Sequence, residues 1–296
     1  MKFRYEYDIM LPKTTPWAAA VALLFVSTSS AADQPAPDKS AYTAFNRTPE
    51  SQLRELNTDR PDLTESPYTV DAGWWQLEMD IFSYTRDHDT AGGADVKTSA
   101  LSIANLNLKI GLTPAIDLQT VFSPSTRVKV TDRISGARAS VSGFGDITSR
   151  LKINFWGNDG GDSAFGLMPF VKWPTNQHGL GNKSVEGGLI VPYARSLPGG
   201  WDLGAMTELD LVRNDADTGY TTEWVNSITV GHDIVGKLGG YVELATVRRS
   251  GPAVVTFDCG LTYGIGKHLQ FDLGTNFGLT RAADDLNVFT GLSLRF

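Results

Sequence analysis

Three ionisable residues, Asp146, Arg150 and Lys152, are separated by even numbers of positions. On an extended strand, residues at i, i+4 and i+6 project from the same face. One acid and two bases on a single face can form salt bridges with neighbouring strands, or they can contact a solute that passes along the face. We favour the salt bridges and keep direct solute contact as the alternative.

Charged residues keep the same parity within several other segments, opposite the apolar residues. An acid excess on the inner face of a closed sheet would favour cations and repel anions by focusing the electric field. The alternative is that these groups pair into a network that stiffens the wall and leaves little pore. The expected inner-face residues that line the passage or form the network are Glu78, Asp80, Lys109, Asp146, Arg150, Lys152, Glu208, Asp210, Asp272 and Arg295.

The sequence offers no catalytic or metal-binding constellation. The four histidines, His88, His178, His232 and His268, fall in expected loops, turns or strand ends, and no His-x-Ser arrangement accompanies them. Hydrolysis by a serine needs a serine, a histidine and an orienting group together, and Cys259 is the single cysteine. We therefore expect no enzyme, no metal and no cofactor, and the formal charge of -7 argues against nucleic acid as a partner.

The elements that must position these charges are strands. From Gly73 onward about twelve segments alternate with a period of two, each end uncertain by about two to four residues. Short turns rich in Gly, Pro, Asn or Asp alternate with longer polar connections, as in a membrane barrel; the range 125–144 is expected to be the longest external loop. The segments are 73–86, 98–111, 115–124, 145–157, 163–173, 184–195, 201–213, 221–232, 237–248, 253–264, 268–279 and 286–296.

The size of the ring decides which face is inside. About eight strands give a barrel that side chains can fill, so a ring of about twelve is too wide for an apolar core. We therefore expect Leu151, Leu209 and Leu273 to face lipid, and the fold class to be an all-β transmembrane antiparallel barrel. Aromatic residues near segment ends are expected in two interfacial girdles: Trp74, Trp75, Phe155, Trp156, Trp173, Tyr193, Trp201, Trp224 and Phe296.

The N-terminal part divides before the barrel. The apolar run at 17–26, preceded by Lys13 and followed by small residues, predicts a signal peptide over 1–32. The range 33–71 is polar and rich in proline and is expected to be a periplasmic or plug-like leader, with the barrel over 72–296. Asp59, Arg60 and Asp62 are expected to dock it against the wall as a plug, and a solvated turn before Pro61 is the alternative.

Several short motifs carry a family resemblance. Thr58 to Asp62 (TDRPD), Gly73 to Glu78 (GWWQLE), Gly143 to Asp146 (GFGD) with Arg150 to Lys152 (RLK), and Lys172 to Thr175 (KWPT) occur in this order. The chain from about Asn57 to Phe296 thus resembles the "meta-pathway of phenol degradation" family. The resemblance implies an outer-membrane β-barrel and a transporter of small, often aromatic, compounds.

These observations predict a channel in the outer membrane of a Gram-negative bacterium that gives small molecules passage through a polar lumen. The expected partners are the lipid bilayer, the solute, and the barrel assembly machinery, which would engage the C-terminal Phe296. One alternative is a closed structural or surface-interaction barrel that presents its loops to partners. Another is a soluble periplasmic β protein.

Overall fold

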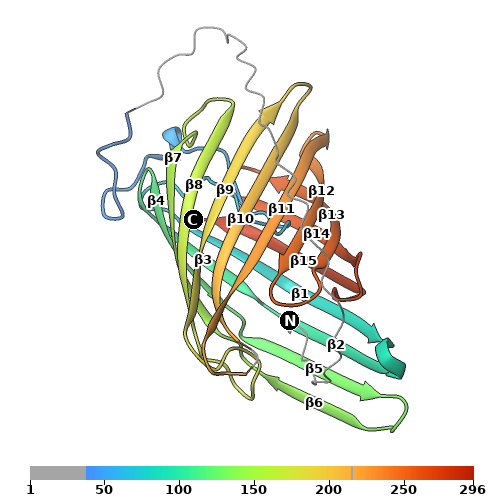
Figure 1. The fold of residues 1–296 in the computed structure, drawn as a ribbon. Helices are drawn as coiled ribbons and strands as arrows, with labels where there is room; N and C mark the ends of the chain where they lie inside the picture. The colour runs from blue at the N-terminus through green and yellow to red at the C-terminus, as the bar shows by residue number, and fades with distance from the viewer. Residues whose placement is uncertain (1–37, 215) are drawn as a thin grey trace, which may run out of the picture. The chain divides into compact units, whose positions relative to one another are not determined.

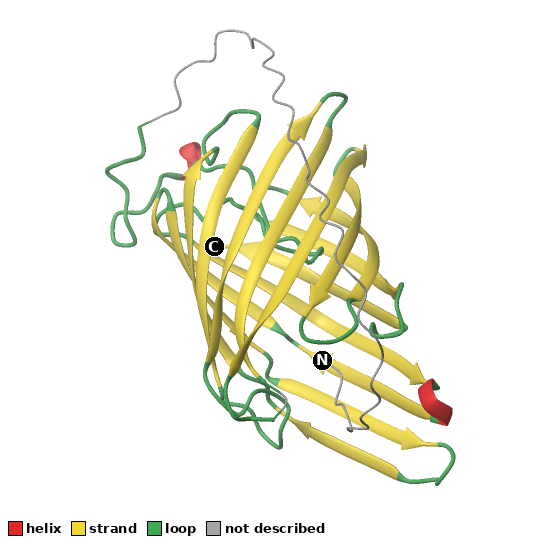
Figure 2. Cartoon of the chain, viewed as in Figure 1, coloured by secondary structure: helices red, strands yellow, loops and turns green. Residues whose placement is uncertain are grey.

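The computed structural model describes residues 38–214 and 216–296, so the expected signal peptide lies outside the described residues. Nearly all regular structure is β (Figure 2), apart from two short 3-10 turns, η1 (Glu50–Gln52) and η2 (Ala91–Gly93). The strands are β1 (Trp75–Asp89), β2 (Val96–Ile103), β3 (Leu106–Thr113), β4 (Ile116–Phe122), β5 (Ser125–Asp132), β6 (Arg138–Gly143), β7 (Ile147–Trp156), β8 (Ser163–Trp173), β9 (Glu186–Leu197), β10 (Trp201–Arg213), β11 (Tyr220–Val235), β12 (Leu238–Arg248), β13 (Val254–Ile265), β14 (Leu269–Gly278) and β15 (Leu286–Arg295).

The strands of the ring close into an antiparallel barrel (Figure 1). Neighbours in sequence pair along the ring from β7 to β15, and β15 returns to pair with β1 from Gln76↔Arg295 to Arg86↔Leu286. The ring contains twelve strands, β1, β3, β4 and β7 through β15, because β2, β5 and β6 lie beyond it on one side. The predicted fold class is therefore confirmed.

Three strands extend the wall beyond the ring. β1 pairs with β3 over its first half and with β2 over its second half, and β2 pairs in turn with β5 and β5 with β6. The extended conformation is interrupted between β2 and β3 at Ala104, whose φ is 59°. The expectation of a loop at 125–144 is therefore wrong, since β5 and β6 form a hairpin there. Their serines and arginines occupy the face on which the ring strands carry apolar residues.

The connections of the ring are short at one end and mostly longer at the other, as predicted, although the turn at 157–162 is longer than the connection at 249–253. The short ones follow β3, β7, β9, β11 and β13, and the longer ones lie at the other end of the barrel. The amide of Trp75 donates to the carbonyl of Phe296 at 2.9 Å, and Phe296 donates back to Trp75 at 2.9 Å. The start of β1 and the end of the chain therefore meet at the short-turn end.

The wall has an apolar outer face and an ionic inner face. Leu273 is 50% exposed whereas its neighbour Asp272 is 4% exposed and Lys152 is fully buried, which is the predicted arrangement. Trp75, Trp156, Trp173, Trp201 and Trp224 are exposed near strand ends, as a girdle requires. Trp74 is a correction: it is buried and its indole donates to the carbonyl of Thr48 at 2.8 Å.

Among the described residues no helix is both long and apolar enough to span a bilayer.

Candidate functional site

We call the segment 38–72 the leader. It begins with largely exposed residues at the short-turn end and passes inside the barrel over about 57–70, where it contacts the inner wall. Its backbone comes so close to the wall at Gly111 that a Cβ there would lie 2.2 Å from the carbonyl oxygen of Asp71. Only glycine leaves room for this approach, and Ala72 forms a parallel bridge with Gly111. The leader and the barrel wall are therefore in direct backbone contact where the leader ends.

Asp59 is the centre of the largest ionic cluster. The ammonium of Lys152 on β7 donates to both carboxylate oxygens of Asp59, at 2.6 and 2.7 Å. Lys109 on β3 bonds to Asp59 and also lies 2.6 Å from Glu78 on β1. The side chains of Asp59, Lys109, Lys152 and Glu78 are 4%, 3%, 0% and 2% exposed, so the cluster is shielded from solvent.

Arg60 ties the leader to β14 and β1, on either side of β15. Its guanidinium donates to Asp272 on β14 at 3.0 and 2.6 Å and also bonds to Asp80 on β1. It lies 5.7 Å from the ring centroid of Phe289 on β15, within cation–π range. A Cβ at Gly291 would lie 2.3 Å from Nη2 of Arg60, so this glycine makes room for the guanidinium.

The next part of the leader is held by Glu243 on β12 and Arg150 on β7. The amides of Leu63 and Thr64 each donate to the Glu243 carboxylate at 2.8 Å. Arg150 donates to Glu65 at 2.5 Å. Burial, followed by the nearby carboxylate of Glu243, raises the pKa of Asp62 well above its ordinary value.

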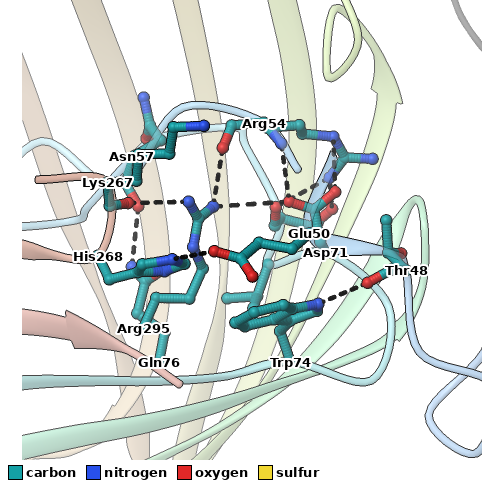
Figure 3. Close-up of polar contacts among 12 residues, drawn as sticks. Thr48, Glu50, Arg54, Asn57, Asp71, Trp74, Gln76, Lys267, His268 and Arg295 are labelled. Carbon is teal, nitrogen blue, oxygen red and sulfur yellow. Dashed lines mark hydrogen bonds and ion pairs between the residues drawn. The ribbon is translucent and has the colours of Figure 1, made fainter. Parts of the chain in front are cut away.

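Two parts of the leader, at Arg54 and at Asp71, meet at the short-turn end of the barrel (Figure 3). The Arg54 amide donates to Asp71 at 3.1 Å, and Arg295 on β15 donates to the Arg54 carbonyl at 2.9 Å and lies 3.6 Å from Asp71. His268 stacks on Trp74 with ring centroids 5.5 Å apart. The C-terminal strand therefore helps to fix the leader in place.

Two leader-linked carboxylates are held ionised by their partners. Burial alone would raise the pKa of Asp59, but the ammonium groups of Lys109 and Lys152 outweigh it, and the pKa lies well below its ordinary value. Asp159, in the turn after β7, shows the same balance: burial is outweighed by hydrogen bonds from Arg54 and Lys39, and its pKa is lowered. Protonation of either group would therefore weaken the docking of the leader.

The predicted inner-face residues do lie on the inner face, but their partners differ from those expected. Arg150 and Lys152 bind leader carboxylates rather than neighbouring strands, and Asp146 does not join them. It accepts hydrogen bonds instead from the Asn176 side chain at 2.7 Å and the Asn182 amide at 2.6 Å, both in the connection after β8. Sequence spacing fixed their common face but could not reveal the leader as partner.

Glu208 and Asp210 share the inner face of β10, beyond Met206 toward the long-loop end. Asp210 is 8% exposed. Both carboxyl groups lie on the long-loop side of the apolar residues described next, on the face where they were expected.

An apolar cluster on the inner wall was missed from the sequence. Met168, Ile190, Met206 and Val225 lie on four consecutive strands, β8 to β11, and are 0%, 1%, 4% and 8% exposed. Phe170 and Val247 pack against them. β8 carries apolar residues on both faces, so alternation alone cannot separate the lumen side from the lipid side; only the register with Arg150↔Phe170 does so.

Space remains between the leader and the wall on the short-turn side of the barrel. A cavity of about 300 Å³ is lined by Asp62, Tyr68, Asp202 and Tyr241 among others, and a second of about 230 Å³ adjoins Arg60 and Gln270. Within 38–214 and 216–296, no group of three or more His, Cys, Asp or Glu side chains is placed to hold a metal ion.

Solved structures share the barrel architecture at low identity. The translocator domain of autotransporter NalP from Neisseria meningitidis is 11% identical, with 75% of this chain and 88% of that chain covered and a TM-score of 0.46. The NanC porin is 7% identical, with 73% of this chain and 98% of that chain covered and a TM-score of 0.48. The toluene transporter TbuX from Ralstonia pickettii is 9% identical, with 75% of this chain and 89% of that chain covered and a TM-score of 0.42.

No curated protein matches the sequence. A family model described as "Putative MetA-pathway of phenol degradation" matches residues 58–296, which include the Asp59 and Arg60 anchors and the whole barrel. The family and the closed barrel identify an outer-membrane β-barrel rather than an enzyme. The chain belongs to this family.

Proposed function

We propose that this barrel is a gated channel in the outer membrane of a Gram-negative bacterium. In the resting state the leader occupies the lumen, and solutes pass when it loosens or shifts. The single observation that carries the proposal is the set of ion pairs at Asp59 and Arg60, which tie the leader to β1, β3, β7 and β14. These four strands lie along one half of the ring, which runs from β7 through β3 and β1 to β14, so the leader is tied to that half of the wall.

The composition of the lumen supports passage of small solutes that carry an apolar part. The cluster of Met168, Ile190, Met206 and Val225 is buried while the leader is docked, and it would offer a flexible apolar surface once the leader shifts. A solute with an aromatic ring and a polar group would find both kinds of partner there. This agrees with the name of TbuX, a toluene transporter.

A closed structural barrel is the second candidate. The dense leader contacts favour it, since each buried ion pair also stiffens the wall. Planar-bilayer recording of the full chain distinguishes the two: steady current steps support the channel, and silence over many insertions supports the closed barrel.

Liposome swelling tests the solute class. With aromatic, sugar and amino-acid solutes, we expect aromatic solutes of equal size to enter fastest. Met206→Gln should reduce that preference, because it replaces part of the apolar surface inside the lumen. The matched control is Met79→Gln, the same substitution on the lipid-facing side of β1, which should leave it unchanged. Equal rates for all solutes in both variants would contradict the aromatic preference.

We also propose that Phe296 serves in assembly. Its backbone pairs with Trp75 at the seam where the barrel closes, and its side chain is 51% exposed. It thus remains accessible to the barrel assembly machinery while the last strand adds to β1. Phe296→Ser should slow insertion in cells without changing the conductance of protein refolded in vitro.

A further inference from the structure

The extension formed by the second half of β1 with β2, β5 and β6 has two distinct faces. The side-chain amide of Asn287, on the inner face of β15, donates to the hydroxyls of Ser83 and Thr85 at 2.9 Å each. Ser83 and Thr85 therefore face inward, and the alternate residues Phe82, Tyr84 and Arg86 face outward.

Strand register carries the outward face across the extension. Arg86 pairs with Ser99, Ser99 with Lys129, and Lys129 with Ser140. Directly opposite residues in a sheet share a face. The bases on this outward face, which we call the basic face, are Arg86, Lys97, Arg127, Lys129 and Arg138, all exposed.

The acidic residues of the same strands do not neutralise the basic face. Asp87, Asp89 and Asp132 have the opposite parity and face the other way. Asp95, just before β2, is engaged by His88 at 2.7 Å and Arg133 at 3.6 Å. Within the described residues, no ion pair involves any of the five bases of the basic face, so their charge is not compensated.

The basic face is continuous with the lipid-facing wall. On the same side of the sheet lie Phe82, Tyr84, Leu101 and Ile103, which are 39%, 41%, 38% and 48% exposed. Arg127 is directly opposite Leu101, and the other four bases follow farther toward the long-loop end. Exposed apolar and aromatic residues at a barrel rim mark the edge of the hydrocarbon. The bases therefore follow where headgroups begin, on the long-loop side of the barrel (Figure 1).

We propose that the basic face binds the phosphate groups of lipid headgroups in the outer leaflet. Arg86, Arg127 and Arg138 can pair with phosphate oxygens in bidentate geometry, and Lys97 and Lys129 supply point charges. The sheet thereby lies against the membrane surface instead of projecting freely into the medium. This inference rests on the outer-membrane location and does not depend on whether the lumen conducts.

The test measures binding of lipid A, a diphosphorylated acyl glycolipid, to the full chain in zwitterionic micelles. Arg127→Gln/Lys129→Gln is compared with Lys237→Gln/Lys267→Gln, which removes two exposed cations from short turns at the other end. Each cation near an anionic lipid surface contributes about fivefold in affinity, so the first variant should bind about 30-fold more weakly. The second should match the wild type.

Two further arms identify the ligand. Lipid A stripped of its phosphates should bind all three proteins equally and weakly, and inorganic phosphate at the same molar concentration should not compete. Raising the ionic strength to about 1 M should remove most of the difference between the variants. Equal lipid A affinity for the two double variants, or undiminished binding of the stripped glycolipid, would overturn the proposal. Full competition by inorganic phosphate would overturn the lipid assignment.

Discussion

Asp59→Asn is the substitution that most sharply tests the docking of the leader. It removes the negative charge shared by Lys109 and Lys152, whose side chains are 3% and 0% exposed. Lys109 keeps Glu78 at 2.6 Å, but the described ion pairs give Lys152 only Asp59. A buried ammonium loses its paired charge, and such a loss costs about 3–5 kcal/mol.

That cost falls mainly on the docked state, because water can solvate Lys152 once the leader leaves. The ratio of undocked to docked leader should therefore rise by about 100- to 5000-fold. In planar bilayers, we expect the mean open fraction of Asp59→Asn to exceed that of the wild type by a large factor at neutral pH. Asp38→Asn is the control, since Asp38 is fully exposed and, among residues 38–214 and 216–296, accepts a hydrogen bond only from nearby Ser40.

An open fraction for Asp59→Asn equal to that of both wild type and Asp38→Asn would refute this reasoning. Heat-modified mobility in gels must first show that all three proteins are folded barrels. The double variant Asp59→Asn/Lys152→Met adds a check, because it removes the unpaired ammonium as well. The open fraction of this double variant should lie between those of Asp59→Asn and the wild type.

The remaining predictions address pH, orientation and close packing. Because the pKa of Asp59 is lowered in the docked state, its contribution to docking is complete above its free value of about 3.9 and is lost as the pH falls further, so the wild-type open fraction should rise below about pH 4. The rise should be smaller for Asp59→Asn, which keeps only the other titrating carboxylates such as Asp159; a flat wild-type profile from pH 7 to 2, or an equal rise in the two proteins, would exclude this. Leu273→Arg places a charge on the lipid-facing wall and should lower the free energy of unfolding in bilayers by up to about 2–4 kcal/mol, whereas Ile134→Arg, in the exposed turn after β5, should change it little; equal denaturant midpoints would place Leu273 away from lipid. Gly111→Val should displace the end of the leader and raise the open fraction, because its Cβ would meet the Asp71 carbonyl at 2.2 Å, while Gly231→Ala has 3.7 Å of clearance and should behave as wild type.

The alternation of residues predicted most strands of the ring, but the single strand expected at 98–111 is wrong, since the structure divides it into β2 and β3 at Ala104. In β7, Ile147, Leu151 and Ile153 oppose Arg150 and Lys152, and a one-residue shift in register would expose the charges to lipid. A strongly two-sided strand therefore has a single acceptable position. The strands observed from β7 to β15 follow the expected segments within a few residues.

β5 and β6 of the extension were missed for a different reason. They carry serine, threonine, arginine and lysine on the outward face and small apolar residues on the other, which is the reverse of the ring strands. β5 also begins directly after Pro124, which indicates a turn when read alone. The pairing of β2 with β5 supplies the order that the local sequence does not specify.

The path of the leader also depends on partners distant in sequence. Arg60 and Asp272 are 212 positions apart, and Thr64 and Glu243 are 179 apart. Composition indicated a polar, irregular segment, and the family motif drew attention to Asp59 and Arg60. Neither could specify which wall residues form ion pairs with Asp59 and Arg60, because these residues come together only when the ring closes.

The inner apolar cluster shows the limit of the rule that charge faces the lumen. Met168 and Ile190 face inward although β8 and β9 present apolar residues on both sides. Proline and glycine in β8 and β9 further blur the alternation. Only the positions of their cross-strand neighbours distinguish the two faces.

The central claim is that the leader occupies and closes the lumen. The most direct measurement compares single-channel currents of the full chain with those of a chain lacking residues 38–68, refolded and recorded in the same bilayers. We predict that the full chain is mostly closed, with brief openings, and that the shortened chain shows large, steady current steps. Equal conductance and equal open fraction in the two proteins would contradict the claim.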